Sequence, residues 1–200
     1  MADTEPISEG TERRRKPHVR GASNRGLGSL LALAAIVIVV GIGAWLLFRD
    51  NGSDSTSTDQ ATPVAATTAD LSAVAAEVKH PVYWAGERTG YTYELTRTRD
   101  GRIYIRYLPK GVDVGDPSPK YTTVGTYPQA GAYAATVKAS RLEGAQAYNT
   151  KSGALVVTNS ATPTSVYFAF KGVPYLVEVF DPSATKALNL ALSGKIRLVQ

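Results

Sequence analysis

The chain has 200 residues and a formal net charge of +5, from 22 Lys and Arg against 17 Asp and Glu. It has no cysteine, so disulfides, thiolate metal sites and cysteine nucleophiles are excluded together. This length allows one or two domains of ordinary size.

The N-terminal part contains a run of 22 uncharged, mostly apolar residues at positions 27–48. As a helix this run is roughly 33 Å long, enough to cross a hydrocarbon core of about 30 Å. Six Arg and Lys residues precede the run, and only Arg49 follows it closely. This charge bias predicts one membrane crossing, with the N-terminus in the cytoplasm and the C-terminal part outside. The run is too long, and too bulky at its end, for a cleaved signal peptide.

The segments on both sides of this run are predicted to lack a folded core. Positions 1–26 are expected to form a disordered basic tail, and positions 49–69 a flexible linker rich in Ser, Thr, Ala and Asp. The folded domain is therefore expected at positions 70–200, outside the cytoplasm and tethered to the cell membrane. Small residues in the membrane segment, such as Gly28 and Ala32, permit self-association of the helix without requiring it.

The elements expected in positions 70–200 follow from periodicity and turn residues. Apolar residues three and four apart predict helices, and β-rich runs bounded by Gly and Pro predict strands. In chain order these are a helix at 71–79 capped by Asp70, strands at 82–84, 91–99 and 102–108, a loop at 108–120, a strand at 121–127, a helix at 130–142, strands at 154–159, 165–170 and 175–180, a helix that Asp181-Pro182 opens and Gly194 ends, and an edge strand at 196–199. Strands dominate and short turns join most of them, which predicts an α+β domain with a mostly antiparallel sheet and two or three helices.

The hairpin at 91–108 carries the pattern that suggests a binding surface. Asp100-Gly101 between its strands predicts a two-residue turn, which places Arg99 opposite Arg102. In that register one face gathers seven tyrosines and arginines, namely Tyr91, Tyr93, Arg97, Arg99, Arg102, Tyr104 and Arg106. Guanidinium groups bind phosphate or carboxylate, and tyrosine rings stack on sugars, so these seven are the candidate ligand-binding residues. The alternative is a structural hairpin whose arginine heads reach water from a packed face.

Five stretches of the outer domain resemble a known group of proteins. They are HPVYWAG at 80–86, GYTYELTRT at 90–98, DGRIYIRYLP at 100–109, YTTVGTYP at 121–128 and GVPYLVEVFDP at 172–182. They resemble single-pass membrane-anchored proteins of GC-rich Gram-positive bacteria, a group with no assigned function. The resemblance implies a cell-envelope location and supplies no catalytic residue.

The outer domain shows no motif for catalysis, metal binding or nucleotide binding. Gly-x-Ser-x-Gly, GxxxxGK[ST] and GxGxxG are missing, His80 is its single histidine, and its carboxylates are dispersed. The sequence therefore predicts a non-enzymatic binding module of the cell envelope, without metal or cofactor, whose ligand is an anionic wall component or an envelope protein. No nucleic-acid partner is expected. The alternatives are an accessory subunit of a membrane protein complex and a small cell-wall hydrolase or transferase.

Overall fold

The computed structural model of the chain describes residues 61–200. The basic tail, the apolar run and positions 49–60 of the expected linker lie outside the described residues. Within residues 61–200, no helix has the length and hydropathy needed to span a membrane.

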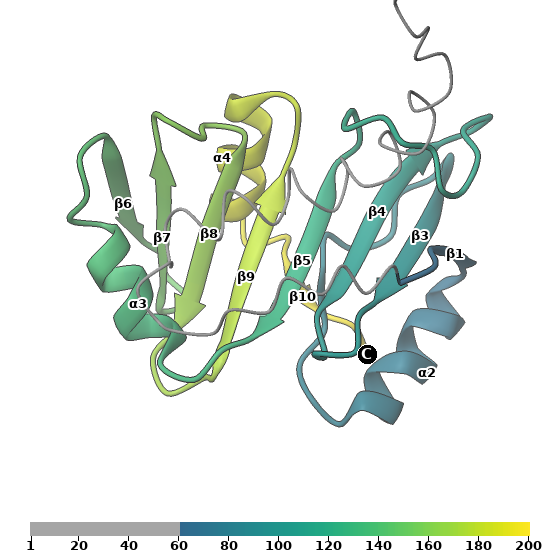
Figure 1. Cartoon of the computed structure of the whole chain (residues 1–200), viewed down its shortest axis with the longest axis horizontal. Helices are drawn as coiled ribbons and strands as arrows, with labels where there is room; N and C mark the ends of the chain where they lie inside the picture. The colour runs from purple at the N-terminus through teal and green to yellow at the C-terminus, as the bar shows by residue number, and fades with distance from the viewer. Residues whose placement is uncertain (1–60) are drawn as a thin grey trace, which may run out of the picture.

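An eight-stranded sheet forms the centre of the described part (Figure 1), and all of its neighbouring strands are antiparallel. In spatial order its strands are β1 (Val64–Ala66), β3 (Tyr91–Arg97), β4 (Ile103–Pro109), β5 (Thr123–Pro128), β9 (Tyr175–Phe180), β8 (Ser165–Phe170), β7 (Ala154–Asn159) and β6 (Ala145–Asn149). A second sheet pairs β2 (Tyr83–Trp84) with β10 (Arg197–Leu198). The helices are α2 (Thr68–Val78), α3 (Ala132–Ala139) and α4 (Ala184–Leu192). The expected α+β class with a mostly antiparallel sheet is confirmed.

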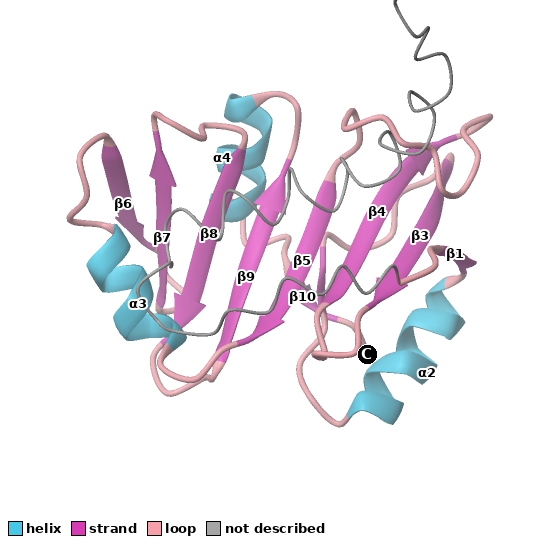
Figure 2. Cartoon of the chain, in the orientation of Figure 1, coloured by secondary structure: helices cyan, strands magenta, loops and turns pink. Residues whose placement is uncertain are grey.

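Both faces of the large sheet are packed, because successive side chains of a strand point to opposite faces. In β8, Val166 and Phe168 join the core that also contains residues of α2, α4 and the β2–β10 pair. Tyr167 lies on the opposite face in a smaller cluster, and α3 covers that face at β7 and β8. Helices α3 and α4 therefore sandwich the β7–β9 half of the sheet (Figure 2).

The domain begins earlier than the sequence suggested. Residues expected in the linker form the edge strand β1, which pairs with β3 from Val64 onward. Thr67, and not Asp70, is the N-cap of α2. The Thr67 hydroxyl accepts a hydrogen bond from the Asp70 backbone N–H, and the Asp70 carboxylate accepts one from the Thr67 N–H. Hydrogen bonds that the Thr67 N–H and the Thr67 hydroxyl donate to the carboxylate hold the pKa of Asp70 below its usual value.

Helix α4 also starts later than expected. Its N-cap is Ser183, whose hydroxyl accepts from the Lys186 N–H. Asp181 instead accepts from the Ser183 N–H at 2.9 Å and from the Thr122 hydroxyl at 2.7 Å. It therefore joins the start of α4 to the segment before β5.

Three strands match the sequence-based prediction residue for residue, namely β7, β8 and β9. The edge strand near the C-terminus is present as β10, which pairs with β2. Strand β6 is not among the expected elements, because its sequence AQAYN offers little alternation of apolar and polar residues.

The predicted register of the hairpin is wrong by one residue. Thr98 pairs with Arg102, since the Thr98 N–H donates to the Arg102 carbonyl and the Gly101 N–H donates to the Thr98 carbonyl. The loop is thus three residues long, and Gly101 alone takes the left-handed conformation, with φ of 80°. Such a turn with a bulge replaces the expected two-residue turn, in which both residues would need positive φ. Arg97 now lies opposite Ile103 instead of Tyr104.

Candidate functional site

The corrected register divides the seven candidate residues of the hairpin between two faces of the sheet. A shift of one residue turns every side chain of one strand to the other face. Tyr91, Tyr93 and Arg97 share one face with Ile103, Ile105 and Tyr107, whereas Tyr104 and Arg106 share the other with Glu94. Arg99 and Arg102 flank Asp100-Gly101 at the turn. The structure does not bring the seven together as one surface.

Two of the three candidate tyrosines are buried. The Tyr93 ring packs edge-on against Trp84 and Tyr107, and its hydroxyl accepts from the Arg88 N–H at 2.8 Å. Tyr104 packs edge-on against Tyr127 with ring centroids 5.6 Å apart. Tyr91, which is 41% exposed, remains available at the surface.

Arg106 is buried and holds a loop onto the sheet. Its guanidinium forms an ion pair with Glu94, and the side chains are only 9% and 1% exposed. The same guanidinium donates to the backbone carbonyls of Asp116 and Ser118 at 3.0 and 3.1 Å. The second Glu94 oxygen accepts from the Gly115 N–H at 2.6 Å. Because every one of these contacts is internal, Arg106 has a structural role.

The remaining arginines are engaged near the surface. Arg97 forms a two-bonded ion pair with Glu77, at 2.9 and 3.0 Å, which joins β3 to α2. Arg102 pairs with Asp100 at 2.7 Å within the turn. Arg99 and Arg102 are exposed and keep their binding role as a prediction.

A buried carboxyl lies at the centre of the sheet. Glu178 on β9 is fully enclosed and accepts hydrogen bonds from the hydroxyls of Tyr127 and Tyr167, on the adjacent strands β5 and β8. Burial raises the pKa of Glu178 to about 7, and the hydroxyl groups partly offset this rise. Burial also raises the pKa of both tyrosines well above 10. A carboxyl with this pKa suits acid–base chemistry, but no substrate reaches an enclosed group, so its role concerns stability.

Other chemistry-bearing groups of the described residues do not converge. His80 stacks on Tyr175 with ring centroids 5.2 Å apart, and its Nδ1 lies 2.9 Å from the Pro81 carbonyl. Within residues 61–200, no three His, Cys, Asp or Glu side chains are grouped as a metal site would require.

A cavity of about 520 Å³, which we call the α4 cavity, opens between the β6–β7 turn and the C-terminal end of α4. Its apolar lining comes from β7, β8, α4 and the segment after it, namely Ala154, Phe168, Phe170, Ala191, Leu192 and Ile196. Its polar lining consists of Asn149, Thr150, Lys151, Ser152 and Ser193, and Gly194 completes it. A volume of this size is ordinary for a small-molecule site, where such pockets span about 300–1,000 Å³.

Small side chains and a short helix leave this cavity open. Ala154 and Ala191 face it from β7 and α4, where larger residues would fill the space. Helix α4 ends at Leu192, and Gly194 with φ of 72° turns the chain toward β10. The aromatic floor formed by Phe168 and Phe170 is therefore left without a covering helix turn at this end.

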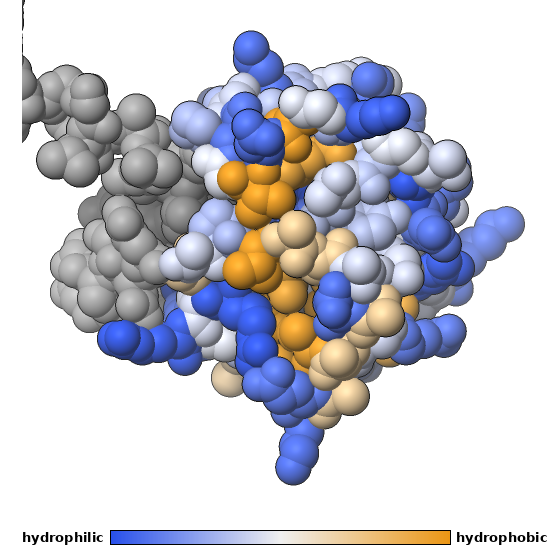
Figure 3. Space-filling model, turned by 90° about the vertical axis from the view of Figure 1, so that its right-hand side faces the viewer, coloured by the Kyte–Doolittle hydropathy of each residue, from blue (hydrophilic) through white to orange (hydrophobic). Residues whose placement is uncertain are grey.

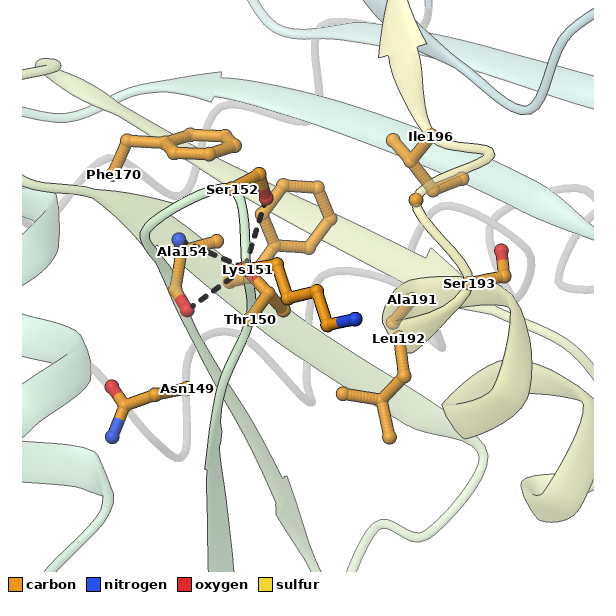
Figure 4. Close-up of a pocket in the computed structure, with 12 residues that line it drawn as sticks. Asn149, Thr150, Lys151, Ser152, Ala154, Phe170, Ala191, Leu192, Ser193 and Ile196 are labelled. Atoms are coloured by element: carbon orange, nitrogen blue, oxygen red, sulfur yellow. Dashed lines mark hydrogen bonds between the residues drawn. The ribbon is translucent and has the colours of Figure 1, made fainter.

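Lys151 crosses the cavity from the tip of the β6–β7 turn toward α4 (Figure 4). The turn is closed by its own hydrogen bonds, since the Thr150 hydroxyl accepts from the Ala154 N–H at 3.0 Å and lies 2.9 Å from the Ser152 hydroxyl. Lys151 is exposed and forms no ion pair with any other residue of 61–200. The cavity thus combines an apolar floor with one cation and no acidic lining residue.

Sequence reasoning missed this cavity, because its lining comes from three separate segments, at 149–154, 168–170 and 191–196. The strands and α4 were expected, but their relative placement was not. The signals available in the sequence were two phenylalanines at alternate positions of β8 and a Lys-Ser-Gly turn, and neither points to a pocket by itself.

Comparison of the chain with protein-family models, with curated proteins and with solved structures found no match.

Proposed function

We propose that the chain is a single-pass, membrane-anchored binding module of the cell envelope whose outer domain holds a small, largely apolar molecule in the α4 cavity. The observation that carries this proposal is the cavity itself, with Phe168 and Phe170 as its floor. The apolar run at 27–48, its flanking charges and the resemblance to envelope proteins support the location.

The cavity suits a bound ligand better than the hairpin does, because its lining residues lie together around one space. Binding pockets enclose a ligand with apolar walls and add a few polar groups that orient it. The α4 cavity has this composition, whereas the arginines of the hairpin are divided between two faces and a turn. Anionic wall polymer remains a proposed ligand of the outer domain as a whole, attracted by the net positive charge to which the exposed Arg99 and Arg102 contribute.

The test is the identity of small molecules that remain bound to the full-length chain purified from its own membranes. Ser152→Trp places a large ring at the mouth of the cavity from an exposed turn position. Ala161→Trp places the same ring on the exposed β7–β8 turn, whose residues do not line the cavity, and is the matched control. We expect mass spectrometry to find a small molecule in the wild type and in the control that is lost from Ser152→Trp. Identical contents in all three proteins would contradict the proposal.

An accessory subunit of a membrane complex is the second candidate, favoured by the ends of the sheet. Strand β6 is an edge strand of five residues with no charge and no proline, the devices that normally block pairing with another chain. At the other end, a band of apolar side chains runs along the side that holds β1 and α2 (Figure 3), and Val64 there is half exposed.

This candidate predicts a protein partner that stays bound at high salt. Gln146→Lys and Ala147→Lys add charge to the β6 edge and should release the partner, whereas Ala134→Lys on the exposed side of α3 should not. Purification in mild detergent at two salt concentrations distinguishes the outcomes. Loss of every partner at high salt in the wild type would count against the accessory-subunit role.

A further inference from the structure

The walls of the α4 cavity suit the body of a narrow apolar molecule. Phe168, which is almost fully buried, and Phe170, which is partly exposed, form the floor, and Ile196 is a further, partly exposed lining residue. Leu192 is 36% exposed and contributes the outer wall. Phe168 and Phe170 belong to β8 and Leu192 to α4, and the main core holds both elements, so this part of the surface is formed before any ligand binds.

The polar lining of the same cavity includes one positive charge, that of Lys151. The Thr150 hydroxyl and backbone N–H form hydrogen bonds with the Ala154 backbone within the turn. The Ser193 hydroxyl donates to the Leu190 carbonyl at 2.8 Å. The Lys151 ammonium has no ion-pair partner in the described part of the chain, and no acidic residue lines the cavity to compete for it. Lys195, which is exposed, follows the lining residue Gly194 directly and adds positive charge near the mouth.

The alternative to a ligand-binding role is that Lys151 only stabilises the end of α4. The last carbonyls of α4 carry partial negative charge, and a nearby cation is stabilising there. If this were the whole role of Lys151, its removal would lower stability slightly and would leave the choice between charged and uncharged ligands unchanged.

We propose that the α4 cavity selects a single-chain amphipathic anion, with its hydrocarbon chain on the Phe168 and Phe170 floor and its carboxylate or phosphate head at Lys151. This inference rests on the proposed function, since it names the ligand class for the same cavity. An ionised head gains a charge-assisted hydrogen bond that an alcohol of equal length lacks. The apolar chain gains burial whichever head it carries.

The experiment uses photoaffinity labelling of the full-length chain in lipid nanodiscs. Two probes carry the same diazirine-bearing ten-carbon chain, one as decanoic acid and one as decanol. Peptide mapping by mass spectrometry measures labelling of the segments 149–154 and 191–196, which line the cavity. We expect the acid to label these segments about tenfold more than the alcohol, because one charge-assisted contact contributes on the order of a tenfold change in affinity.

Lys151→Gln removes the charge and keeps a polar, slightly shorter side chain. It should lower labelling by the acid to the level of the alcohol and leave labelling by the alcohol unchanged. Lys110→Gln, at an exposed position after β4 that does not line the cavity, is the matched control and should change neither probe. The melting temperature of each variant, measured in parallel, separates loss of the head-group contact from loss of the fold.

The outcomes separate the two proposals. If neither probe labels the cavity segments, the proposed function fails together with this inference. If both probes label them equally and Lys151→Gln changes nothing, the cavity binds apolar molecules and the selection for an anion is refuted.

A third arm of the experiment replaces zwitterionic disc lipid by anionic lipid. We expect labelling by the acid probe to be the same in both kinds of disc. Lower labelling in anionic discs would show that the disc lipid competes for the cavity, and that the natural ligand is a membrane lipid and not a free molecule.

Discussion

Arg106 and Glu94 lie opposite each other on β4 and β3, and both side chains are buried. An ion pair in such a position is held by its geometry and by the additional hydrogen bonds that satisfy each partner. Here the additional bonds come from the backbone of the loop after β4, at Gly115, Asp116 and Ser118. The pair therefore fixes the path of that loop over the sheet.

Removing one partner of this pair leaves an uncompensated buried charge. Arg106→Ala is expected to lower the free energy of unfolding by about 3 kcal/mol, as measured by denaturant titration. Arg102→Ala is the control, because its ion pair is exposed, and it should cost within about 0.5 kcal/mol. Equal effects of the two substitutions would show that the Arg106 pair is not buried as described.

Glu178 makes the stability of the domain depend on pH. Its pKa rises from the ordinary value of 4.5 to about 7 on folding, because burial disfavours the carboxylate. A raised pKa in the folded state contributes stability that is complete below pH 4.5 and is lost as the pH rises through about 7. The contribution amounts to about 3 kcal/mol, since each unit of pKa corresponds to about 1.4 kcal/mol.

The free energy of unfolding is thus expected to fall between pH 4.5 and about pH 7, the interval between the two pKa values, and to level off above it. Glu178→Gln removes the ionisation and should flatten this part of the curve. Glu87→Gln, at an exposed position, should leave the curve as in the wild type. A wild-type curve that is flat or rises over this interval would refute a neutral, buried Glu178.

At the scale of elements, a glycine of β5 makes room for the tyrosine ring that contacts the buried carboxyl. The residues paired across β4, β5, β9 and β8 are Tyr104, Gly125, Glu178 and Tyr167. Gly125 pairs with Tyr104 on one side and with Glu178 on the other. A Cβ at Gly125 would lie 2.8 Å from Cε2 of Tyr127 and 3.0 Å from its hydroxyl oxygen. The tyrosine ring therefore lies over the glycine, and this position lets its hydroxyl reach Glu178.

Gly125→Ala is expected to displace the Tyr127 ring and to destabilise the domain by about 1–3 kcal/mol through overpacking. Gly125 does not have a positive φ, so the cost is steric and not conformational. In a Tyr127→Leu background the same substitution should cost less, and a double-mutant cycle in urea measures the difference. Additive effects of the two substitutions would mean that the ring does not lie over Gly125.

At the scale of the whole molecule, the positive charge of residues 61–200 is not gathered on the predicted hairpin face. From Asp70 onward the chain has fifteen Lys and Arg against ten Asp and Glu. Several of the arginines are paired with acids, as Arg97 is with Glu77, and Arg106 is enclosed. Attraction to an anionic polymer is then a property of the net charge more than of one cluster.

Retention of the full-length protein on purified anionic wall polymer tests this distribution. Arg99→Gln with Arg102→Gln should weaken retention at low salt about as much as Lys110→Gln with Lys171→Gln, because each pair removes two exposed charges. A much larger effect of the arginine pair would restore the hairpin turn as a specific binding site.

The sequence by itself determined the class of the fold and many of its strands. Alternation of apolar residues and the turn residues between them identified β7, β8 and β9 to the residue, because these signals are local. The predictions of a membrane segment and its orientation also rest on local composition and charge, and they concern residues outside those described.

Tertiary structure alone decided which side chains meet. Asp100-Gly101 suits a two-residue turn, but the backbone closes the hairpin between Thr98 and Arg102, and this shift of one residue divided the candidate binding face. Arg106 is buried because a loop distant in sequence from its partner Glu94 folds over both. The α4 cavity arises where a turn, a strand and the end of a helix come together. Contacts between distant segments produce no periodic pattern in the sequence, so the α4 cavity could be identified only in the folded chain.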